Sequence, residues 1–367
     1  MTKIEKFMRS GLSEVDVYAA SKASDVLSKE IGIPVDKIIK MDDNENPYGC
    51  SPRVMKAFAT SHEFNTYADV TQKELHEQIA KYAGVEANWV TAENGSNMLI
   101  DDLLSIFIEP GDKVINFPPT FDIFRVRTNF RGGQLTVIPR DKSFAVDVKA
   151  ARAAIDSKTK LIVLVSPNNP TGTITPKKDI QELIDTGLPM IVDEAYFEFC
   201  GETSAALVKQ HENLMVLRTF SKWAGLAGIR LGYSITSPKI AEALMKVKIP
   251  FSVSIPARIA ARESLADVDY LMSTVKKIVA ERERLFNELG ALKFIKPFPS
   301  KSNFIFCAVT KGSASEVQKK LEKKGILVRY FNLPYLENSL RIGVGKPEHT
   351  DALMKELRNI EGEISKA

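Results

Sequence analysis

The sequence of 367 residues is poor in the residue types that build metal sites and disulfide frameworks. It contains three cysteines, Cys50, Cys200 and Cys307, and four histidines, and neither set clusters along the chain. An odd number of widely spaced cysteines argues against a disulfide framework or a zinc knuckle. We therefore expect no metal ion, and a reducing compartment, of which the cytoplasm is the simplest.

Long hydrophobic runs and an excess of one charge are also missing. No apolar stretch approaches the roughly 18 residues of a membrane-spanning helix, and residues 1–20 lack the apolar core of a signal peptide. The net charge is +4, with Lys and Arg interspersed among Asp and Glu. No basic patch is evident, so we expect neither nucleic acid nor a membrane as a partner.

The sequence does contain an alternation of strand-like and helical segments. Continuous apolar runs are typical of parallel strands that are covered on both faces. Helical segments such as 148–154 and 177–184 lie between these runs, which predicts an α/β, doubly wound, mostly parallel sheet. The predicted strands are residues 113–117, 134–139, 161–165, 189–193, 214–217 and 231–236.

The chain is longer than a single core usually supports, so we predict a division into parts. Residues 1–40 are a helix-rich N-terminal arm that belongs in part to a small domain. Residues 41–260 are the large domain, and residues 261–367 are a smaller α+β domain. Around and within this last part we expect one long helix at 255–289, then short strands at 302–308, 325–329 and 340–344 that alternate with helices near 316–324 and 350–360.

Polar side chains follow three of the predicted strands, at the point where each strand ends. They are an amide (Asn169), a carboxylate with a phenol (Asp193 and Tyr196), and two hydroxyls with an amine (Thr219, Ser221 and Lys222). Ligands in open α/β sheets bind beyond the carboxyl ends of the strands. These side chains are therefore expected at one edge of the sheet.

A lysine and a carboxylate at one edge suit pyridoxal 5′-phosphate (PLP), whose aldehyde needs an amine and whose pyridine nitrogen needs an acidic partner. Lys222 supplies the amine, and its apolar neighbours Trp223 and Leu226 would lower its pKa. Asp193 supplies the carboxylate. Alone, Lys222 would be read as a solvated loop residue and Asp193 as a turn cap; their joint order indicates the cofactor.

Three further residues suit the ring of that cofactor. Asn169 and Tyr196 can hydrogen-bond its 3-hydroxyl group, and Phe121 can lie over its face. Plain packing is the alternative for each of them.

The cofactor phosphate needs an anion site of its own. Thr219, Ser221 and Arg230 can donate to phosphate oxygens, the arginine through its planar fork. Ser96 and Asn97 stand where a predicted helix begins, so free N–H groups and the helix dipole would face an anion there. A simple helix cap is the alternative for these two residues.

The order of these motifs carries a family resemblance. NPTG at 169–172, DEAY at 193–196 and SK at 221–222, followed by Arg230, resemble the fold-type I aminotransferases. Within them, NENPYG at 44–49, RTFSK at 218–222, GLAGIR at 225–230 and GILVR at 325–329 resemble the histidinol-phosphate aminotransferases. The resemblance spans about residues 40 to 345. It implies a PLP fold-type I architecture and amino transfer between histidinol phosphate and 2-oxoglutarate, with glutamate as the other product, in histidine biosynthesis.

The resemblance also implies roles for the cofactor residues. Lys222 would bond covalently to PLP and shuttle the proton of the substrate. Asp193 would pair with the pyridinium, Asn169 and Tyr196 with the 3-hydroxyl, and Phe121 would stack on the ring. The implied phosphate ligands are Ser96, Asn97, Thr219, Ser221 and Arg230.

Further residues are implied at the substrate and at a subunit interface. Tyr67 would reach the cofactor phosphate of a second subunit, which implies a homodimer. Arg341 matches the arginine that binds the anionic group of the substrate, with Arg329 as its neighbour. Tyr18 and Asn46 are implied as further substrate-binding residues.

Some positions depart from the family pattern, and alternatives remain. Residues 93–98 read ENGSNM where many members have GNGSDE, and Phe121 stands where many have tyrosine. The alternatives are an aromatic amino-acid aminotransferase, a PLP-dependent phosphate-ester decarboxylase and a non-enzymatic binding protein. The intact set of Lys222, Asp193 and Arg230 argues against the last of these.

Overall fold

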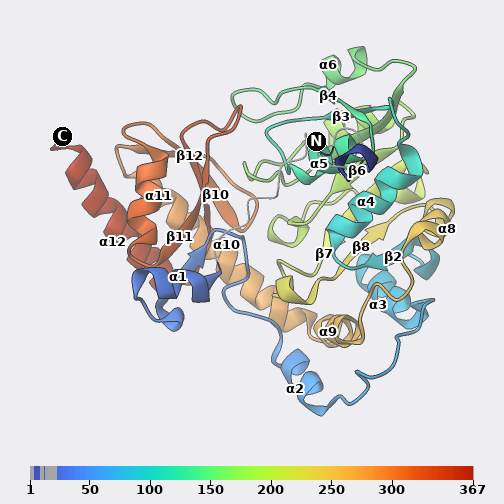
Figure 1. Cartoon of the computed structure of the whole chain (residues 1–367), viewed down its shortest axis with the longest axis horizontal. Helices are drawn as coiled ribbons and strands as arrows, with labels where there is room; N and C mark the ends of the chain where they lie inside the picture. The colour runs from blue at the N-terminus through green and yellow to red at the C-terminus, as the bar shows by residue number, and fades with distance from the viewer. Residues whose placement is uncertain (1–3, 9–11, 13–22, 367) are drawn as a thin grey trace.

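The computed structural model describes residues 4–8, 12 and 23–366 (Figure 1). The sequence-predicted site residue Tyr18 lies outside this part of the chain. Of the predicted N-terminal arm, the structure describes helix α1 (Ser24–Ile31) and the short 3-10 turns Glu5–Phe7 and Val35–Lys37.

The larger of two sheets has seven strands in the order β2-β8-β7-β6-β5-β3-β4. The pairs from β7 to β4 are parallel, whereas β8 runs antiparallel to both β2 and β7. The predicted α/β, mostly parallel sheet is therefore confirmed. Its strands are β2 (Val90–Glu93), β3 (Lys113–Asn116), β4 (Gln134–Val137), β5 (Thr159–Val165), β6 (Met190–Asp193), β7 (Leu214–Thr219) and β8 (Gly232–Ile235).

The central strands are apolar on both faces because each face is covered by helices. Along β5, Ile162 and Leu164 point into one core, while Leu161, Val163 and Val165 point into the other. One face is covered by α4 (Ser96–Phe107), α5 (Ile123–Phe130) and α8 (Pro238–Val247). The other is covered by α3 (Lys73–Ala83), α6 (Val148–Ala153), α7 (Lys177–Ile184) and α9 (Ile255–Leu265).

A second sheet has five strands in the order β1-β11-β12-β10-β9. Strand β1 is parallel to β11, and the other pairs are antiparallel. Figure 1 shows this sheet with α11 and α12 at one end of the molecule and the seven-stranded sheet at the other, with α10 between them. The elements are β1 (Ile39–Met41), α10 (Val268–Gly290), β9 (Ile295–Pro297), β10 (Phe304–Val309), α11 (Ala314–Glu322), β11 (Ile326–Phe331), β12 (Ser339–Gly343) and α12 (Pro347–Ile364).

Because β1 joins strands from the end of the chain, the second sheet is built from both ends of the sequence. The division at residues 40 and 260 remains a proposal. Among the described residues, no helix combines the length and the apolar character needed to cross a bilayer.

Two sequence-based expectations differ from the structure. The predicted single helix at 255–289 is wrong, because Ala266 and Asp267 separate α9 from α10. Asp267 has φ −131° and ψ 34°, outside the helical region, and accepts a hydrogen bond from the Ser51 hydroxyl, just before helix α2 (Pro52–Thr60). Strand β2 was not predicted, since buried Thr91 and Glu93 interrupt its apolar pattern.

Candidate active site

Asp193 lies at the meeting point of three strand ends. It is the last residue of β6, and in register it faces Val165 of β5 and Leu217 of β7. Its side chain is buried and accepts one hydrogen bond, from the backbone N–H of Ala195 at 3.0 Å. Among the described residues no cation forms an ion pair with it, and burial raises the pKa of Asp193 to about 7. A cationic group bound here would form an ion pair with this carboxyl group.

Lys222 lies in the loop that follows β7. Its Nζ donates to the backbone carbonyl of Asp43 at 2.8 Å. Burial, and then the nearby charge of Arg341, lower the pKa of Lys222 to about 8. Trp223 is fully buried beside it. An amine with this pKa is partly deprotonated near physiological pH, and only the neutral amine acts as a nucleophile.

Asn46 holds the lysine loop in place. Its Nδ2 donates to the carbonyl of Trp223 at 3.0 Å, and its Oδ1 accepts from the backbone N–H of Tyr48 at 2.9 Å. These contacts are with the chain itself and fix the segment that faces Lys222. The substrate-binding role expected for Asn46 stays a prediction.

Tyr196 and Asn169 are both tied to segments that come from elsewhere in the fold. The Tyr196 hydroxyl accepts from Nδ2 of Asn44 at 3.0 Å, and its ring packs edge-on against Phe304 of the second sheet. Asn169 accepts from Nη1 of Arg341 at 2.7 Å. The site therefore spans both sheets.

Arg341 lies on β12 and is mostly buried. Besides Asn169, it donates through Nη2 to the carbonyl of Asp42. Arg329 of β11 stands directly opposite Arg341 in the antiparallel register, as the resemblance implied. Two guanidinium-bearing residues thus occupy neighbouring strands at the edge of the site.

The residues expected around a phosphate converge on the start of α4. Arg230 has a left-handed φ of 58°, and a Cβ on Gly95 would lie 2.5 Å from its Nη2, so a larger residue at position 95 would displace the guanidinium from this place. A Cβ on Gly232 would lie 2.4 Å from the backbone nitrogen of Ser96. Asn97, the next residue of the helix, is exposed.

The Thr219 hydroxyl lies 2.9 Å from Ser221 Oγ and 3.2 Å from the carbonyl oxygen of Leu231, and its one proton can be donated to either. It also accepts from the backbone N–H of Ser221 at 3.0 Å. The hydroxyls of Thr219 and Ser221 are thereby held close to Leu231, which lies between Arg230 and strand β8. With the start of α4, they form a set of donors of the kind that binds a phosphate.

Phe121 lies half-buried ahead of α5 and packs against the core of that face. The loop that carries it is joined to the Asn169 loop by Asn168, which sequence reasoning missed. Asn168 donates to the carbonyl of Pro119 at 2.9 Å and accepts from the Thr120 hydroxyl at 2.7 Å. The sequence feature that could have indicated Asn168 is that it directly precedes Asn169.

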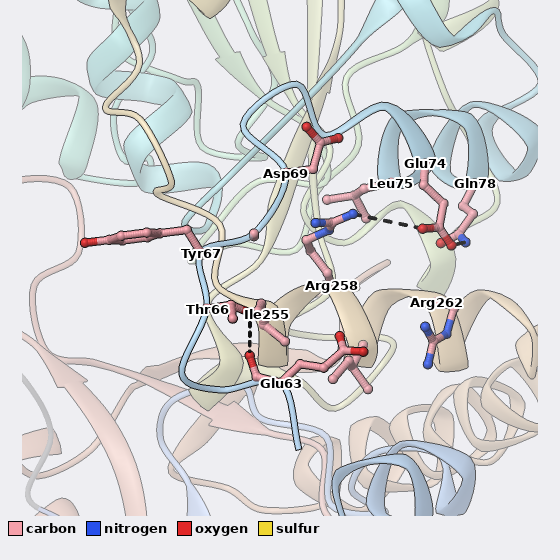
Figure 2. A pocket seen from close by; sticks show the side chains of 12 residues that line it. Glu63, Thr66, Tyr67, Asp69, Glu74, Leu75, Gln78, Ile255, Arg258 and Arg262 are labelled. Atoms are coloured by element: carbon pink, nitrogen blue, oxygen red, sulfur yellow. Dashed lines mark hydrogen bonds and ion pairs between the residues drawn. The ribbon is translucent and has the colours of Figure 1, made fainter. Parts of the chain in front are cut away.

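Tyr67 is not brought into contact with the Lys222 set within this chain. It is 82% exposed, and its ring packs on Phe251 with centroids 4.6 Å apart. Figure 2 shows its side chain projecting away from the other residues that line the adjacent pocket, among them Asp69, Arg258 and Arg262. Its expected role across a subunit interface stays a prediction.

A buried ion pair beneath the site was also missed. Arg218 donates to Glu194 Oε2 from Nε at 3.2 Å and from Nη2 at 3.1 Å. Nη2 also donates to the Thr203 hydroxyl at 2.6 Å, and the guanidinium lies 3.8 Å from the ring centroid of Phe197. Glu194 follows Asp193 and Arg218 precedes Thr219 on the adjacent strand, so the opposite charges at two neighbouring strand ends were a usable signal.

The residues present fit PLP. They offer an amine of lowered pKa, a buried acid with a raised pKa and no cationic partner among the described residues, and a set of anion donors at a helix start. In the part of the chain that the structure describes, no group of three His, Cys, Asp or Glu side chains could hold a metal ion.

Comparison with known proteins supports the same interpretation. Residues 36–359 match the model of the family "Aminotransferase class I and II". A histidinol-phosphate aminotransferase of Dehalococcoides mccartyi is 46% identical over 354 residues, which are 96% of this chain and 98% of that relative. A chloroplastic histidinol-phosphate aminotransferase of Nicotiana tabacum is 39% identical over 97% of this chain and 87% of its own length.

Solved structures share the fold. The histidinol-phosphate aminotransferase of Sinorhizobium meliloti, in complex with pyridoxal-5′-phosphate, superposes with a TM-score of 0.85 at 25% identity, over 94% of this chain and 96% of that one. The predicted fold-type I class is confirmed by this likeness together with the family match.

Proposed function

This chain belongs to the class I and II aminotransferases, and from that premise we propose that it is a PLP-dependent histidinol-phosphate aminotransferase. It would transfer an amino group between histidinol phosphate and 2-oxoglutarate, a step of histidine biosynthesis. The observation that carries the proposal is that Lys222 and Arg341 donate to the carbonyls of consecutive residues, Asp43 and Asp42. An amine and an anion-binding fork are thereby held side by side, as an amino donor with a negatively charged group requires.

When bound, PLP supplies an aldehyde that accepts the amino group and a ring that withdraws electrons from the substrate. Lys222 Nζ holds the aldehyde end and moves the proton at the substrate Cα. The Asp193 carboxylate keeps the ring nitrogen protonated. Asn169 and the Tyr196 hydroxyl would hold the 3-hydroxyl group of the ring, and Phe121 would pack against the ring.

The phosphate of PLP is assigned to the donors at the start of α4. Arg230 lies against Gly95, and the Thr219 and Ser221 hydroxyls are held by each other and by Leu231. The first N–H groups of the helix at Ser96 and Asn97 complete the set. Helix dipole and guanidinium both favour a doubly charged anion at this place.

Substrate choice is assigned to the two arginines of the second sheet. Arg341 presents a planar fork to an oxyanion, and Arg329 adds a second positive charge from the adjacent strand. The phosphate of histidinol phosphate in one half-reaction and a carboxylate of glutamate in the other both suit this fork. The 46% identity to a histidinol-phosphate aminotransferase supports the same substrate.

A homodimer completes the proposed site. The exposed ring of Tyr67 packs on that of Phe251, and the exposed apolar residues Phe64 and Ile249 lie close to these two in sequence. We assign the surface around Tyr67 to a two-fold interface across which Tyr67 reaches the cofactor phosphate of the second subunit. Because all three cysteines are free thiols, we place the enzyme in the cytoplasm.

A substrate panel tests the function. Purified enzyme loaded with PLP is given histidinol phosphate, phenylalanine and O-phosphothreonine, each with 2-oxoglutarate, and both glutamate and carbon dioxide are measured. We expect glutamate from histidinol phosphate at the highest kcat/KM. Carbon dioxide from O-phosphothreonine, or a higher kcat/KM for phenylalanine, would overturn the proposal in favour of a decarboxylase or an aromatic aminotransferase.

A further inference from the structure

Arg140 is a buried cation with an uncommon set of partners. It follows β4, is 6% exposed, and has no carboxylate partner among the described residues. Its three guanidinium nitrogens each donate to a backbone carbonyl: Nε to Phe117 at 3.1 Å, Nη1 to Phe144 at 3.1 Å and Nη2 to Val165 at 3.2 Å. Burial lowers the pKa of Arg140 to about 9, so it remains charged at neutral pH. A buried charge needs hydrogen-bond partners, and the places of these three carbonyls in the fold indicate what Arg140 does.

Two of the three carbonyls stand at the roots of cofactor loops. Phe117 directly follows β3 and precedes the loop that carries Phe121. Val165 is the last residue of β5 and precedes the loop that carries Asn169. The backbone N–H of Arg140 adds a bond to the carbonyl of Pro118 at 2.8 Å. Arg140 therefore holds both loops at the sheet edge, and Asn168 joins them a second time further out.

The third carbonyl leads toward the second sheet. Phe144 lies in a turn with a left-handed φ of 64°, and its ring packs edge-on against Phe298 and Phe306, with centroids 5.0 and 5.5 Å away. Phe306 of β10 stands directly opposite Arg341 of β12. One guanidinium thus connects the two cofactor loops to the strand pair that carries the substrate arginine.

We propose that Arg140 is a positioning residue that fixes the cofactor loops of Phe121 and Asn169 relative to each other and to the strand of Arg341. Three bonds in one plane set three segments at once, which only a guanidinium fork can do. This inference rests on the proposed function, because it concerns the same site. Arg140 would therefore affect the surroundings of the PLP ring as well as the stability of the fold.

The test compares Arg140→Met and Arg140→Lys with Leu357→Ala, a stability control. Leu357 is fully buried in the core of the second sheet on α12. In the holoenzyme, the pH midpoint of the visible absorption band of bound PLP is measured. We expect Arg140→Met to move it by about one pH unit, since the ring contacts of Asn169 and Phe121 change. Arg140→Lys keeps charge but loses the fork, so it should move the midpoint less, and Leu357→Ala should leave it in place.

A second measurement needs no cofactor. Hydrogen exchange of the apoprotein should quicken by about ten-fold or more in peptides that cover the three held segments, residues 116–122, 141–146 and 165–172, in Arg140→Met, and only there. Equal midpoints and equal exchange in Arg140→Met and Leu357→Ala would overturn the proposal. If the wild-type protein bound no PLP, the proposed function would fail, while the exchange result would still judge the link between the loops.

A milder variant guards against misfolding of Arg140→Met. Phe144→Leu leaves the carbonyl in place and changes the packing of the side chain in its cluster with Phe298, Phe306 and Leu336. We expect it to raise the KM for histidinol phosphate by several-fold, with kcat and the PLP midpoint retained. A fall in kcat with unchanged KM would contradict the link from Arg140 to the second sheet.

Discussion

Lys222 and Arg341 lie 119 residues apart in sequence, yet both donate to one short segment, through the carbonyls of Asp43 at 2.8 Å and of Asp42. This segment runs between the loop after β7 and strand β12 of the second sheet. The Lys222 amine and the Arg341 guanidinium are therefore positioned by the same segment. Because both side chains bond to this segment, the positive charge of Arg341 lies near Lys222. It is the second cause of the lowered pKa of Lys222, and burial is the first.

The first prediction concerns the pH at which Lys222 reacts. Its pKa of about 8 lies below the 10.5 of a free lysine, so the neutral amine gains population as pH rises through about 8. Recombination of apoprotein with PLP should therefore accelerate from pH 7 to pH 9. The rate is followed by visible absorbance, with free lysine as the control. The rate with free lysine should keep rising through this range because its pKa is 10.5, whereas the rate with Lys222 should level off above about pH 8.

Borohydride reduction followed by peptide mass spectrometry should then find the cofactor fixed on Lys222. Lys222→Ala should lose both the label and transamination. A label on Lys248, a buried lysine that donates to the carbonyl of Ala92 shortly before α4, would contradict the assignment.

The second prediction separates charge from shape at Asp193. Asp193→Asn keeps the size of the side chain but cannot stabilise a protonated ring nitrogen. We expect kcat to fall by at least about 100-fold, while the affinity for PLP weakens less. Single-turnover kinetics and PLP titration measure the two effects, and a near-normal rate would mean that the ring nitrogen has a different partner.

The third prediction uses the same variant without cofactor. The pKa of Asp193, about 7 in the folded apoprotein, lies above its ordinary 3.8, so the folded state holds this proton more tightly than the unfolded state. Its contribution to stability is full below pH 3.8 and is lost as pH rises to about 7. At pH 8, Asp193→Asn should therefore stabilise the apoprotein, by at most about 4 kcal/mol.

Thermal unfolding of wild type and Asp193→Asn from pH 4 to pH 8 checks the sign. The advantage of the variant should shrink as the pH falls toward 4, because the carboxyl group of the folded state is then protonated and buried without a charge. An advantage that grew toward low pH would show that the Asp193 pKa is not raised. Added PLP should favour the wild type, since its ring nitrogen supplies the missing cation.

The strands that were predicted share one physical property. Those at 161–165, 189–193 and 214–217 are buried on both faces, and their apolar runs are visible without any partner. Strand β2 and the reversed direction of β8 were not predictable in this way. Burial of Thr91 and Glu93 depends on groups far away in sequence, such as the ion pair of Glu93 with Lys248 at 3.2 Å.

The candidate site likewise contains residues that could be predicted from the sequence and residues that could not. Asp193 ends β6 and Lys222 follows β7. Their place at one edge of the sheet was predictable because the α/β topology itself brings strand ends together. Arg140 was not, because its three acceptors are backbone carbonyls, which leave no trace in side-chain patterns. The bond of Asn46 to the carbonyl of Trp223 was hidden for the same reason.

The fourth prediction is that each active site is completed by two subunits. Lys222→Ala and Tyr67→Ala, each inactive at low PLP concentration, are mixed, dissociated and reassociated. Random pairing makes half of the dimers hybrids with one intact site, so about a quarter of the wild-type activity should return. Tyr270→Phe, a change at another exposed tyrosine, serves as the control that keeps full activity in its own homodimer.

No recovery on mixing, or an active enzyme that sediments as a monomer, would refute the shared site. Tyr67→Phe refines the test, because it keeps the ring contact with Phe251 and removes only the hydroxyl. It should assemble normally and bind PLP more weakly.

The last prediction concerns the anion of the substrate. Arg341 and Arg329 face each other across β12 and β11, and Arg341 is oriented by Asn169. Loss of a charge-assisted hydrogen bond to such a guanidinium costs roughly 1.5 to 3 kcal/mol, or about ten-fold to over a hundred-fold in kcat/KM. Histidinol phosphate should therefore be preferred over histidinol by at least about ten-fold.

Arg341→Lys keeps the charge but loses the planar fork, so it should lower kcat/KM for histidinol phosphate and for glutamate together. It should also narrow the preference for histidinol phosphate over histidinol, because the phosphate loses one of its two bonds while histidinol loses none. Steady-state kinetics of both half-reactions measure this, with Arg358→Lys on the exposed face of α12 as the matched control. If the variant lowered kcat/KM for histidinol as much as for histidinol phosphate, Arg341 would be positioning Asn169 and the anion would bind elsewhere.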